Sequence, residues 1–410
     1  MRILYLTQWF DPEPNIIKGL AFVKALEAAG HDVLVVTGFP NYPGGKLYPG
    51  YRLRPISRET IDSVRVVRLP LYPSHDRSSL RRSVNYLSFF VSAFLYCLLR
   101  ARRFDLIYAY HPPITVGLAA VLGGWPWRRP VILDIQDLWP DTLAATGMAG
   151  TARLTGPLGR VCAFVHGRAS RIIIQSEGMR SALVARGVSE VKISSIANWA
   201  LGVDELAQGG EPPQGTPFCL IYAGNLGLAQ GLSTVVSAAN QLAARKSGIE
   251  IHLFGDGVEA DAVRAEAGRI SALHVHDRIA RTALAREIRS AGALLLHLRD
   301  EPLFRVTIPS KVQYYLAAGR PIVAAIAGEA ADMLRASGAA IVVPPEDPEA
   351  LAAACEEMAA LGREDRKAMG QAGRAYYEHH LSFRRGIDAT LAQIDTLRGK
   401  PGTNRQVLAA

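Results

Sequence analysis

The sequence predicts an α/β fold built from two doubly wound parallel-sheet domains. The chain opens with a buried strand at residues 2–7, a loop, a helix at 20–29 and a second strand at 31–37, which is the order of a parallel β-α-β unit. The same pattern starts again at residue 219, after a stretch rich in Gly, Pro and Gln. A length of 410 residues is also typical of two domains rather than one.

The expected domain limits follow from this change in composition. We expect residues 1–200 to form an N-terminal Rossmann-like domain, 201–217 to be a linker, and 218–380 to form a C-terminal Rossmann-like domain. A last helix within residues 381–398 is expected to cross back to the N-terminal domain. The tail, residues 399–410, is predicted to be disordered.

Short apolar runs that end in polar or glycine-rich segments predict the remaining strands. These runs are residues 105–110, 131–135, 171–175, 191–196, 219–223, 249–254, 294–298, 321–325 and 340–343. Further helices are expected at residues 232–244, 349–361, 363–378 and 384–397.

Composition bounds the class of protein. Hydrophobic residues make up 49% of the chain and charged residues 20%, which argues against a disordered chain. The four cysteines lie far apart without a CxxC pair, a spacing that favours reduced thiols in a cytosol over a disulfide framework or a zinc site. The N-terminus has one basic residue and a short apolar run, so we expect a strand there and not a signal peptide.

Positive charge is concentrated in the first half of the chain. The net charge is +9, and residues 1–200 hold 24 Lys and Arg against 13 Asp and Glu, a net of +11. A basic half joined to a nearly neutral half predicts an anionic partner for the first half only. The chain shows no recognised DNA- or RNA-binding motif, so an anionic membrane surface fits better than nucleic acid.

Residues 84–99, VNYLSFFVSAFLYCLL, are apolar except for a narrow stripe formed by Asn85, Ser88 and Ser92. As a helix this run would be about 24 Å long, shorter than the ~30 Å hydrocarbon core of a bilayer. It fits a buried core helix, and equally a helix lying against an anionic leaflet with arginines on the headgroups. The candidate membrane residues are Arg81, Arg82, Phe89, Phe90, Arg100, Arg102 and Arg103.

Polar residues follow two predicted strands of the first half. His111 comes after one strand, in YHPP, and Asp134 and Asp137 lie at the end of the next, in DIQDLWPD. Ligands of open α/β sheets bind at the carboxyl ends of strands. Any one of these residues could be structural, but three at the same edge favour a catalytic role.

The stretch TIPSKVQYYLAAGRPIVAA at residues 307–325 predicts a helix followed by a buried strand. We expect Thr307 to cap a helix that begins near Pro309. Free N–H groups at that helix start, beside Ser310 and Lys311, would suit a phosphate. An ordinary αβ unit with a solvated lysine is the alternative.

Two glycine-rich loops precede this stretch: GNLGLAQG, with Gly224, Asn225 and Gln230, and GDG, with Gly255 and Gly257. Each follows a predicted strand. The first loop of the chain holds only one glycine, Gly19, so the dinucleotide-binding fingerprint is absent where it would be decisive.

Together these segments resemble the family-4 glycosyltransferases of the GT-B fold, over nearly the whole chain. The segments that carry the resemblance are FDPEPNIIKGLAFVKALEAAGHDVLVVTG, AYHPP, DIQDLWPD, AGNLGLAQGL, FGDG, PSKVQYYLAAGRPIV and GEAADML. PNYPGGKLYPGYR and DIQDLWPDTL are similar to a narrower branch, the N-acetyl-L-fucosamine transferases of bacterial surface-polysaccharide assembly.

The resemblance implies two Rossmann-like domains facing across a cleft, with the nucleotide-sugar bound mainly to the second. It implies a hexosyltransferase-type enzyme that transfers a sugar from a UDP-sugar with retention of configuration. The departing phosphate would take the proton of the acceptor. His111 would steady the donor sugar, and Asp137 or Asp134 would orient the acceptor hydroxyl. The implied donor-binding residues are Gly19, Gly224, Asn225, Gln230, Gly255, Gly257, Arg305, Ser310 and Lys311.

We expect no cofactor and no divalent metal, because the sequence has no Asp-x-Asp and no His/Cys/Asp group at metal-ligand spacing. The expected acceptor is a polyprenyl-diphosphate-linked saccharide of O-antigen (lipopolysaccharide) or capsule biosynthesis. Its two phosphates suit the basic first half. The enzyme would then be cytoplasmic and peripheral on the inner face of the plasma membrane.

The chain departs from the wider family at the diphosphate. Where the family has Arg and Lys in G-R-L-x-x-x-K-G, this chain has Asn225 and Gln230, and where it has a Glu-x7-Glu pair, this chain has Val306 and Tyr314. We therefore expect Lys311, with Arg305 as a second candidate, to bear more of the diphosphate charge. Two other functions stay open: a nucleotide-sugar epimerase on the same scaffold, and a non-catalytic homologue.

Overall fold

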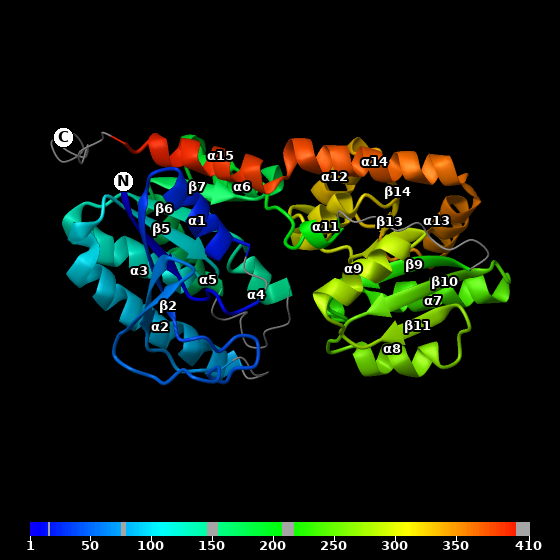
Figure 1. Ribbon diagram of the computed structural model, residues 1–410, viewed down its shortest axis with the longest axis horizontal. Coiled ribbons are helices and arrows are strands. Elements are labelled where there is room, and N and C mark those ends of the chain that lie inside the picture. The colour runs from blue at the N-terminus through cyan, green and yellow to red at the C-terminus, as the bar shows by residue number, and fades with distance from the viewer. Residues whose placement is uncertain (15–16, 75–78, 146–154, 207–216, 399–410) are drawn as a thin grey trace. The chain divides into compact units, whose positions relative to one another are not determined.

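The computed structural model describes residues 1–14, 17–74, 79–145, 155–206 and 217–398 (Figure 1). The chain divides into two compact units, each with its own parallel sheet. Unit 1 is Met1–Ile196 with Gly386–Ala410, and unit 2 is Ala197–Arg385.

Among the described residues, the sheet of unit 1 has the strand order β3-β4-β2-β1-β5-β6-β7-β8. Of the strand pairs in the described part of this unit, only β3–β4 is antiparallel. The strands are β1 (Arg2–Thr7), β2 (Asp32–Gly38), β3 (Ser57–Ile61), β4 (Val64–Leu69), β5 (Leu106–His111), β6 (Val131–Ile135), β7 (Arg171–Ile174) and β8 (Ile193–Ser195). The helices are α1 (Leu20–Ala28), α2 (Ser79–Arg100), α3 (Ile114–Gly124), α4 (Asp141–Ala145), α5 (Thr155–Arg168), α6 (Glu177–Ala185) and α15 (Phe383–Asp395), the last of which starts in unit 2.

The central strands of unit 1 are apolar on both faces, as strands covered by helices on both sides must be. Strand order reverses next to β1, where Ile3 pairs with Val33 of β2 on one side and with Leu106 of β5 on the other. Such a reversal leaves a crevice at the carboxyl ends of the two strands, which is where open α/β sheets bind ligands.

Unit 2 repeats this topology in the order β11-β10-β9-β12-β13-β14, with all pairs parallel. Its reversal lies between β9 and β12. The strands are β9 (Phe218–Ala223), β10 (Ile249–Phe254), β11 (Leu273–His276), β12 (Ala293–His297), β13 (Ile322–Ala325) and β14 (Ala340–Val343). The helices are α7 (Leu232–Ala244), α8 (Ala260–Ala267), α9 (Arg281–Ser290), α10 (Pro302–Arg305), α11 (Ser310–Ala318), α12 (Glu329–Ala336), α13 (Pro348–Ala360) and α14 (Arg363–His380).

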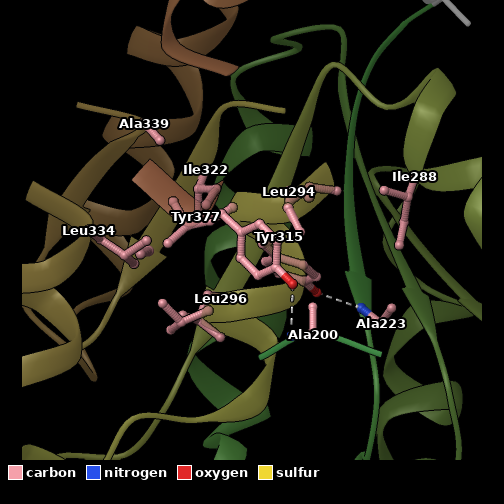
Figure 2. Close-up of a cluster of buried hydrophobic side chains, with 14 of the residues drawn as sticks. Ala200, Ala223, Ile288, Leu294, Leu296, Tyr315, Ile322, Leu334, Ala339 and Tyr377 are labelled. Atoms are coloured by element: carbon pink, nitrogen blue, oxygen red, sulfur yellow. Dashed lines mark hydrogen bonds between the residues drawn. The ribbon is translucent and has the colours of Figure 1, made fainter. Parts of the chain in front are cut away.

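The core behind α11 fixes that helix against the end of β9 (Figure 2). Tyr315 is 1% exposed, and its hydroxyl accepts a hydrogen bond of 2.9 Å from the backbone N–H of Ala223. Nearby, the hydroxyl of Tyr377 accepts a hydrogen bond of 3.3 Å from Ala200 N. Burial of a large aromatic ring with its hydroxyl satisfied stabilises the position of the whole helix.

The predicted fold is confirmed: two parallel-sheet α/β domains, with each expected strand observed within about two residues of its expected limits. The edge strand β11 was not predicted, and neither was the β3–β4 hairpin. Its strands are joined by Asp62 and Ser63, which both have positive φ (44° and 75°) as a two-residue hairpin turn requires. Because neither residue is glycine, the turn gave no sequence signal.

The predicted cap of α11 is wrong. Pro309, not Thr307, is the N-cap residue, and no side chain caps the helix. The Thr307 hydroxyl instead donates to the carbonyl of Leu303 at 3.0 Å. Of the predicted linker, residues 201–206 belong to unit 2, whereas 207–216 lie outside the described residues, as does the predicted disordered tail at 399–410.

Helix α2 is longer than the predicted run and spans 22 residues, or about 33 Å at 1.5 Å per residue. With the turn after it, the segment Leu80–Arg103 is long and apolar enough to cross a membrane by length and composition. The expectation that this helix is too short for a bilayer is therefore wrong.

Candidate functional site

The loops after β9 and β10 are in direct backbone contact at the strand-order reversal of unit 2. Gly224 has φ +146° and Gly255 has φ +159°, and the N–H of Gly224 donates to Phe254 O at 2.9 Å. A Cβ atom on Gly255 would lie 1.8 Å from the carbonyl oxygen of Gly224. No other residue fits there, because any side chain would force the two loops apart. Gly257 lies in the second loop. The neighbouring Asp256 O accepts a 2.9 Å hydrogen bond from Leu226 N of the first loop.

Lys311 lies directly on Gly224. A Cβ atom on that glycine would be 2.5 Å from Lys311 Cε. The Lys311 ammonium donates to the Tyr222 hydroxyl at 2.8 Å and lies 4.5 Å from the centre of the same ring. Lys311 and Tyr315 are four residues apart on one face of α11, so the bond from Ala223 N to Tyr315 also positions the lysine.

The surroundings of Lys311 make its ammonium group more acidic. Removal from water lowers the pKa of Lys311 to about 8. Among the described residues, no carboxylate forms an ion pair with it. The start of α11, with exposed Ser310 and no side-chain cap, adds the positive end of a helix dipole. A lysine beside an open helix start is an arrangement that suits an anion.

Two arginines of the segment between β12 and α11 are already paired. Arg305 forms a two-pronged contact with Asp300, with both N–O distances 2.7 Å, and Arg299 pairs with Glu301 and Glu346 at 3.5 Å each. Hydrogen bonds from Arg305 hold the pKa of Asp300 below its usual range. Arg305, a predicted donor-binding residue, is therefore neutralised by its neighbour.

Asn225 and Gln230 bind each other across the first glycine-rich loop. Asn225 Nδ2 donates to Gln230 Oε1 at 3.3 Å, and Gly227 N donates to the same oxygen at 3.2 Å. Two neutral amides thus shape the loop without adding charge. Sequence reasoning missed His297, which is fully buried at the end of β12 and bridges to Gln230 O at 2.6 Å and to Glu346 N at 3.3 Å. A histidine ending a buried strand was the available signal.

In unit 1, His111 ends β5 as a buried histidine, 1% exposed. Neither of its ring nitrogens has a hydrogen-bond partner among the described residues. Burial, with a smaller contribution from His166, lowers the pKa of His111 to about 3. Its ring contacts Trp139 edge to face, with centres 6.3 Å apart. Buried polar atoms are rarely left unpaired, so these two nitrogens mark His111 as a candidate for contact with a ligand.

Asp134 does not fit its predicted role. Its carboxylate is 0% exposed and ion-paired with fully buried Lys18, and it accepts hydrogen bonds from the Tyr108 hydroxyl and from Gln136 Nε2 (2.6 Å). A carboxylate enclosed in this way cannot reach an acceptor hydroxyl. Its contacts instead fix the loop that carries Lys18.

Asp137 is half-buried after β6, and removal from water raises its pKa to about 6. This carboxylate, and not Asp134, keeps the properties expected of an orienting residue.

Gly19 does not resemble the glycines of unit 2. It is the N-cap of α1 with an ordinary φ of −89°, and the N–H of Leu20 donates to the Asp11 carboxylate at 2.8 Å. Because a carboxylate of the chain itself occupies this helix start, the prediction of Gly19 as a donor-binding residue is not supported by its surroundings.

Half-buried aromatic rings form a chain of contacts near His111. Trp139 lies 6.0 Å from Tyr86, Tyr86 lies 6.2 Å from Trp9, and Trp9 lies 5.5 Å from Tyr42, between ring centres. These four residues, the aromatic rim, were not singled out in the sequence because they come from four separate segments.

One side of α2 packs against the rest of unit 1, and the polar stripe of the helix lies on this side. Asn85 Nδ2 donates to Tyr72 O, and the Ser92 hydroxyl donates to Pro70 O, both at 2.6 Å. Phe89 is fully buried on this side, so its prediction as a membrane residue is wrong. Phe90 is half-buried and stacks on Phe94 with ring centres 6.0 Å apart. Helix α3 packs alongside α2 (Figure 1).

The opposite side of α2 is exposed and apolar. Its residues recur every three or four positions, so they form one stripe along the helix. Leu80 is 74% exposed and Leu99 67% exposed. We call this set the outer stripe; its members are Leu80, Val84, Leu87, Val91, Leu95 and Leu99.

Basic and aromatic side chains surround the end of the outer stripe. Trp127 donates from Nε1 to Leu98 O at 2.7 Å, and the guanidinium of Arg102 lies 5.9 Å from its ring centre. Arg168 lies 4.3 Å from the ring centre of Trp125. Both tryptophans are exposed. Of the predicted membrane arginines, Arg81, Arg102 and Arg103 are exposed, and Arg82 and Arg100 are half-buried.

Comparison with known proteins identifies the domains. Residues 20–199 match the glycosyl transferase 4-like domain, and residues 217–360 match the glycosyl transferases group 1 domain. The chain belongs to the glycosyltransferases. The predicted family is thereby confirmed at this level, whereas its N-acetyl-L-fucosamine branch stays a prediction.

Two relatives of this glycosyltransferase are bacterial. It is 27% identical over 265 residues to WcaI of Escherichia coli (strain K12), a proposed colanic acid biosynthesis glycosyl transferase, covering 59% of this chain and 63% of WcaI. It is 24% identical over 302 residues to WbjE of Pseudomonas aeruginosa, a proposed glycosyltransferase, covering 69% of this chain and 72% of WbjE. The chain thus spans less than two thirds of the length of WcaI.

Solved structures share the GT-B fold with this glycosyltransferase. HepE of Anabaena in complex with UDP superposes with a TM-score of 0.71 at 14% identity, covering 97% of this chain and all of HepE. The trehalose-6-phosphate enzyme of E. coli with UDP-2-fluoro glucose gives the same TM-score and identity, covering 98% of this chain and 100% of that chain.

Proposed function

We propose that this glycosyltransferase moves a sugar from a UDP-sugar to a lipid-linked saccharide at a membrane surface, in O-antigen or capsule biosynthesis. The single observation that carries the donor part is Lys311 seated on Gly224 at the strand-order reversal of unit 2. The solved structures of HepE with UDP and with UDP-glucose support the nucleotide. The colanic acid assignment of WcaI supports a surface polysaccharide.

The diphosphate of the donor is held by Lys311 and the start of α11, and Gly224, which has no side chain, leaves room for the lysine. These groups meet negative charge as it develops on the departing diphosphate, without needing to reorganise. In the wider family an Arg and a Lys bind the diphosphate. This chain has Asn225 and Gln230 at those positions, so Lys311 and the start of α11 take over that role. Because the lysine is protonated below its pKa of about 8, donor binding is expected to weaken as the pH rises through that value.

Transfer with retention of configuration needs no protein nucleophile when the departing phosphate takes the acceptor proton. His111, neutral at every pH above about 3 because of its lowered pKa, acts as a hydrogen-bonding group that steadies the donor sugar. Asp137 orients the acceptor hydroxyl. The enzyme performs this chemistry without a divalent metal, and its main contribution is to hold the substrates in line.

The donor sugar is an N-acetylated deoxysugar such as N-acetyl-L-fucosamine. Support comes from the resemblance of PNYPGGKLYPGYR and DIQDLWPDTL to that branch. The half-buried aromatic rim suits the acceptor, since sugar rings pack on aromatic faces and Tyr and Trp also offer a polar group.

The membrane partner is supported by the outer stripe of α2. An exposed apolar stripe with tryptophan and arginine at one end is the pattern of a helix that lies in the interface of an anionic bilayer. Each arginine near such a surface adds about 1 kcal/mol of attraction, and residues 1–200 carry a net charge of +11. Asn85, on the inward side of α2, contacts Gln8 next to Trp9 of the aromatic rim, so the helix leads from the proposed membrane face to the proposed acceptor site.

The proposed function is tested by incubating the enzyme with a UDP-sugar, with and without a lipid-linked acceptor, and measuring the release of UDP. We expect UDP and a glycosylated lipid to form together, in the presence or absence of EDTA. An isomer of the donor formed without acceptor would show an epimerase instead. No product with any tested donor, despite UDP binding, would show a non-catalytic homologue.

A further inference from the structure

Outside the sites described above, unit 2 gathers histidine, glutamate and cysteine on one face of its sheet. The parallel register pairs Cys219 of β9 with Glu250 of β10, and His252 of β10 with His274 of β11. Residues paired in this way point to the same face. All four side chains are half-buried, and they are remote from one another in the sequence except for Glu250 and His252.

Three of the four donor atoms lie close together, and His274 adjoins them at Glu250. The possible ligand atoms of Cys219, Glu250 and His252 are all within 4.8 Å of one another. Glu250 Oε2 is 3.2 Å from His252 Nε2 and 3.6 Å from His274 Nε2. Tetrahedral zinc with bonds of about 2.0–2.3 Å holds its ligand atoms roughly 3.3–3.8 Å apart by geometry; the Glu250–His274 distance lies within this range and the Glu250–His252 distance is just below it.

His274 Nε2 is buried and has no hydrogen-bond partner among the described residues. This nitrogen faces the Glu250 carboxylate at a distance just beyond hydrogen bonding. An unpaired buried nitrogen is destabilising, and a cation between it and the carboxylate would satisfy both.

His276 supports His252 from outside the group. Its Nε2 lies 3.0 Å from His252 Nδ1. When His252 donates its Nδ1 proton to His276, its Nε2 lone pair is free for a metal. Partners of this kind on the second ring nitrogen are usual for metal-bound histidines, where they fix the tautomer. The Glu287 carboxylate of α9 adds negative charge near both rings.

We propose that Cys219 Sγ, a Glu250 carboxylate oxygen, His252 Nε2 and His274 Nε2 bind one divalent ion of the zinc class, with His276 as a positioning residue. Mixed sulfur, nitrogen and oxygen donors select borderline transition metals over Mg²⁺ or Ca²⁺. The ligands come from three neighbouring strands, so the ion cross-links β9, β10 and the edge strand β11. The site is separate from the anion site at Lys311 and does not rest on the proposed function.

Titration of the full-length, untagged, chelator-treated protein with Co²⁺ tests the proposal. We expect one equivalent to bind and to give the visible absorption of tetrahedral cobalt together with a near-ultraviolet thiolate band. Cys219→Ser should lose the thiolate band and keep the visible one. His274→Ala should weaken binding at least 100-fold, and His276→Ala about 10–100-fold. Zn²⁺ should raise the thermal unfolding temperature of the wild type.

His379→Ala is the matched control, because His379 is an exposed histidine of the same unit; it should bind Co²⁺ as the wild type does. Circular dichroism and UDP binding check that each variant is folded. Absence of a saturable Co²⁺ spectrum in the folded wild type, or unchanged affinity in both Cys219→Ser and His274→Ala, would overturn the proposal and leave a hydrogen-bonded histidine group.

Discussion

Asp134 and Asp137 lie three residues apart after the same strand, yet their carboxylates have opposite surroundings. Asp134 is enclosed by Lys18, Tyr108 and Gln136, whereas the pKa of Asp137 is raised to about 6 by removal from water. The sequence DIQDLWPD did not separate them, because Lys18 and Tyr108 belong to distant segments. At this scale the sequence located the edge of the sheet but not the role of each residue.

The two aspartates should respond differently to amidation. Asp134→Asn leaves the Lys18 ammonium buried without its partner, so it should cost roughly 3–5 kcal/mol of unfolding free energy. Asp137→Asn should instead raise the unfolding temperature at pH 8, since the ionised carboxylate is disfavoured in the folded state. The native carboxyl keeps its proton at higher pH than the unfolded one, so the wild type loses stability as the pH rises from about 4 to 6.

Thermal unfolding of both variants and the wild type at pH 4, 6 and 8 measures this contrast. The gain from Asp137→Asn should shrink toward pH 4. Equal destabilisation of both variants at pH 8 would contradict the assignment.

The pH dependence of the rate should come from Asp137 and not from His111. If ionised Asp137 orients the acceptor, kcat/KM rises with pH through about 6 to a plateau that ends near 8, where Lys311 loses its proton, and the Asp137→Asn profile is low and flat below that limit. His111→Gln should lower the rate and keep the wild-type shape, because its pKa of about 3 lies below the range. If the rise of kcat/KM near pH 6 were absent in His111→Gln, the titrating group would be the histidine and not Asp137.

At the scale of elements, α2 shows what a sequence can and cannot specify. Its apolar length and flanking arginines were evident, but which residues face the unit was not. Phe89 and Leu87 are equally apolar, yet Phe89 is fully buried and Leu87 is 56% exposed. The side of α2 that faces the unit is set by its polar stripe, because Asn85 and Ser92 donate hydrogen bonds to the backbone carbonyls of Tyr72 and Pro70. The positions of those carbonyls could not be predicted from the sequence.

Substitutions on the two sides of α2 should separate folding from membrane binding. Phe89→Ala should cost about 3–5 kcal/mol of unfolding free energy because it leaves a cavity. The pair Leu87→Glu with Leu95→Glu, on the outer stripe, should leave the unfolding temperature within a few degrees and abolish binding to anionic vesicles.

Flotation with vesicles that contain anionic lipid measures the membrane binding of these variants. The wild type should bind at low salt and be released as salt screens the arginines, and Leu53→Glu, at another exposed leucine of unit 1, is the control. Equal flotation of the Leu87/Leu95 variant and the wild type would rule out the outer stripe as the membrane face.

At the scale of the molecule, the chain uses one topology twice with different chemistry at each strand-order reversal. Unit 1 places His111 and Asp137 there, with an aromatic rim, and unit 2 places Gly224, Gly255 and Lys311. The repeated β-loop-α pattern and the glycines at strand ends made both edges predictable. The Cys219–Glu250–His274 group was not, because parallel register alone brings its members together.

Binding of UDP to the wild type and to Lys311→Met, measured by calorimetry at pH 7, tests the central assignment most directly. Lys367→Met is the control, since Lys367 is an exposed lysine of unit 2. Loss of a charge-assisted hydrogen bond to the diphosphate, about 1.5–3 kcal/mol, predicts a Kd roughly 10- to 150-fold higher for Lys311→Met and unchanged for the control. A Lys311→Met protein that is folded and binds UDP as tightly as the wild type would contradict the account.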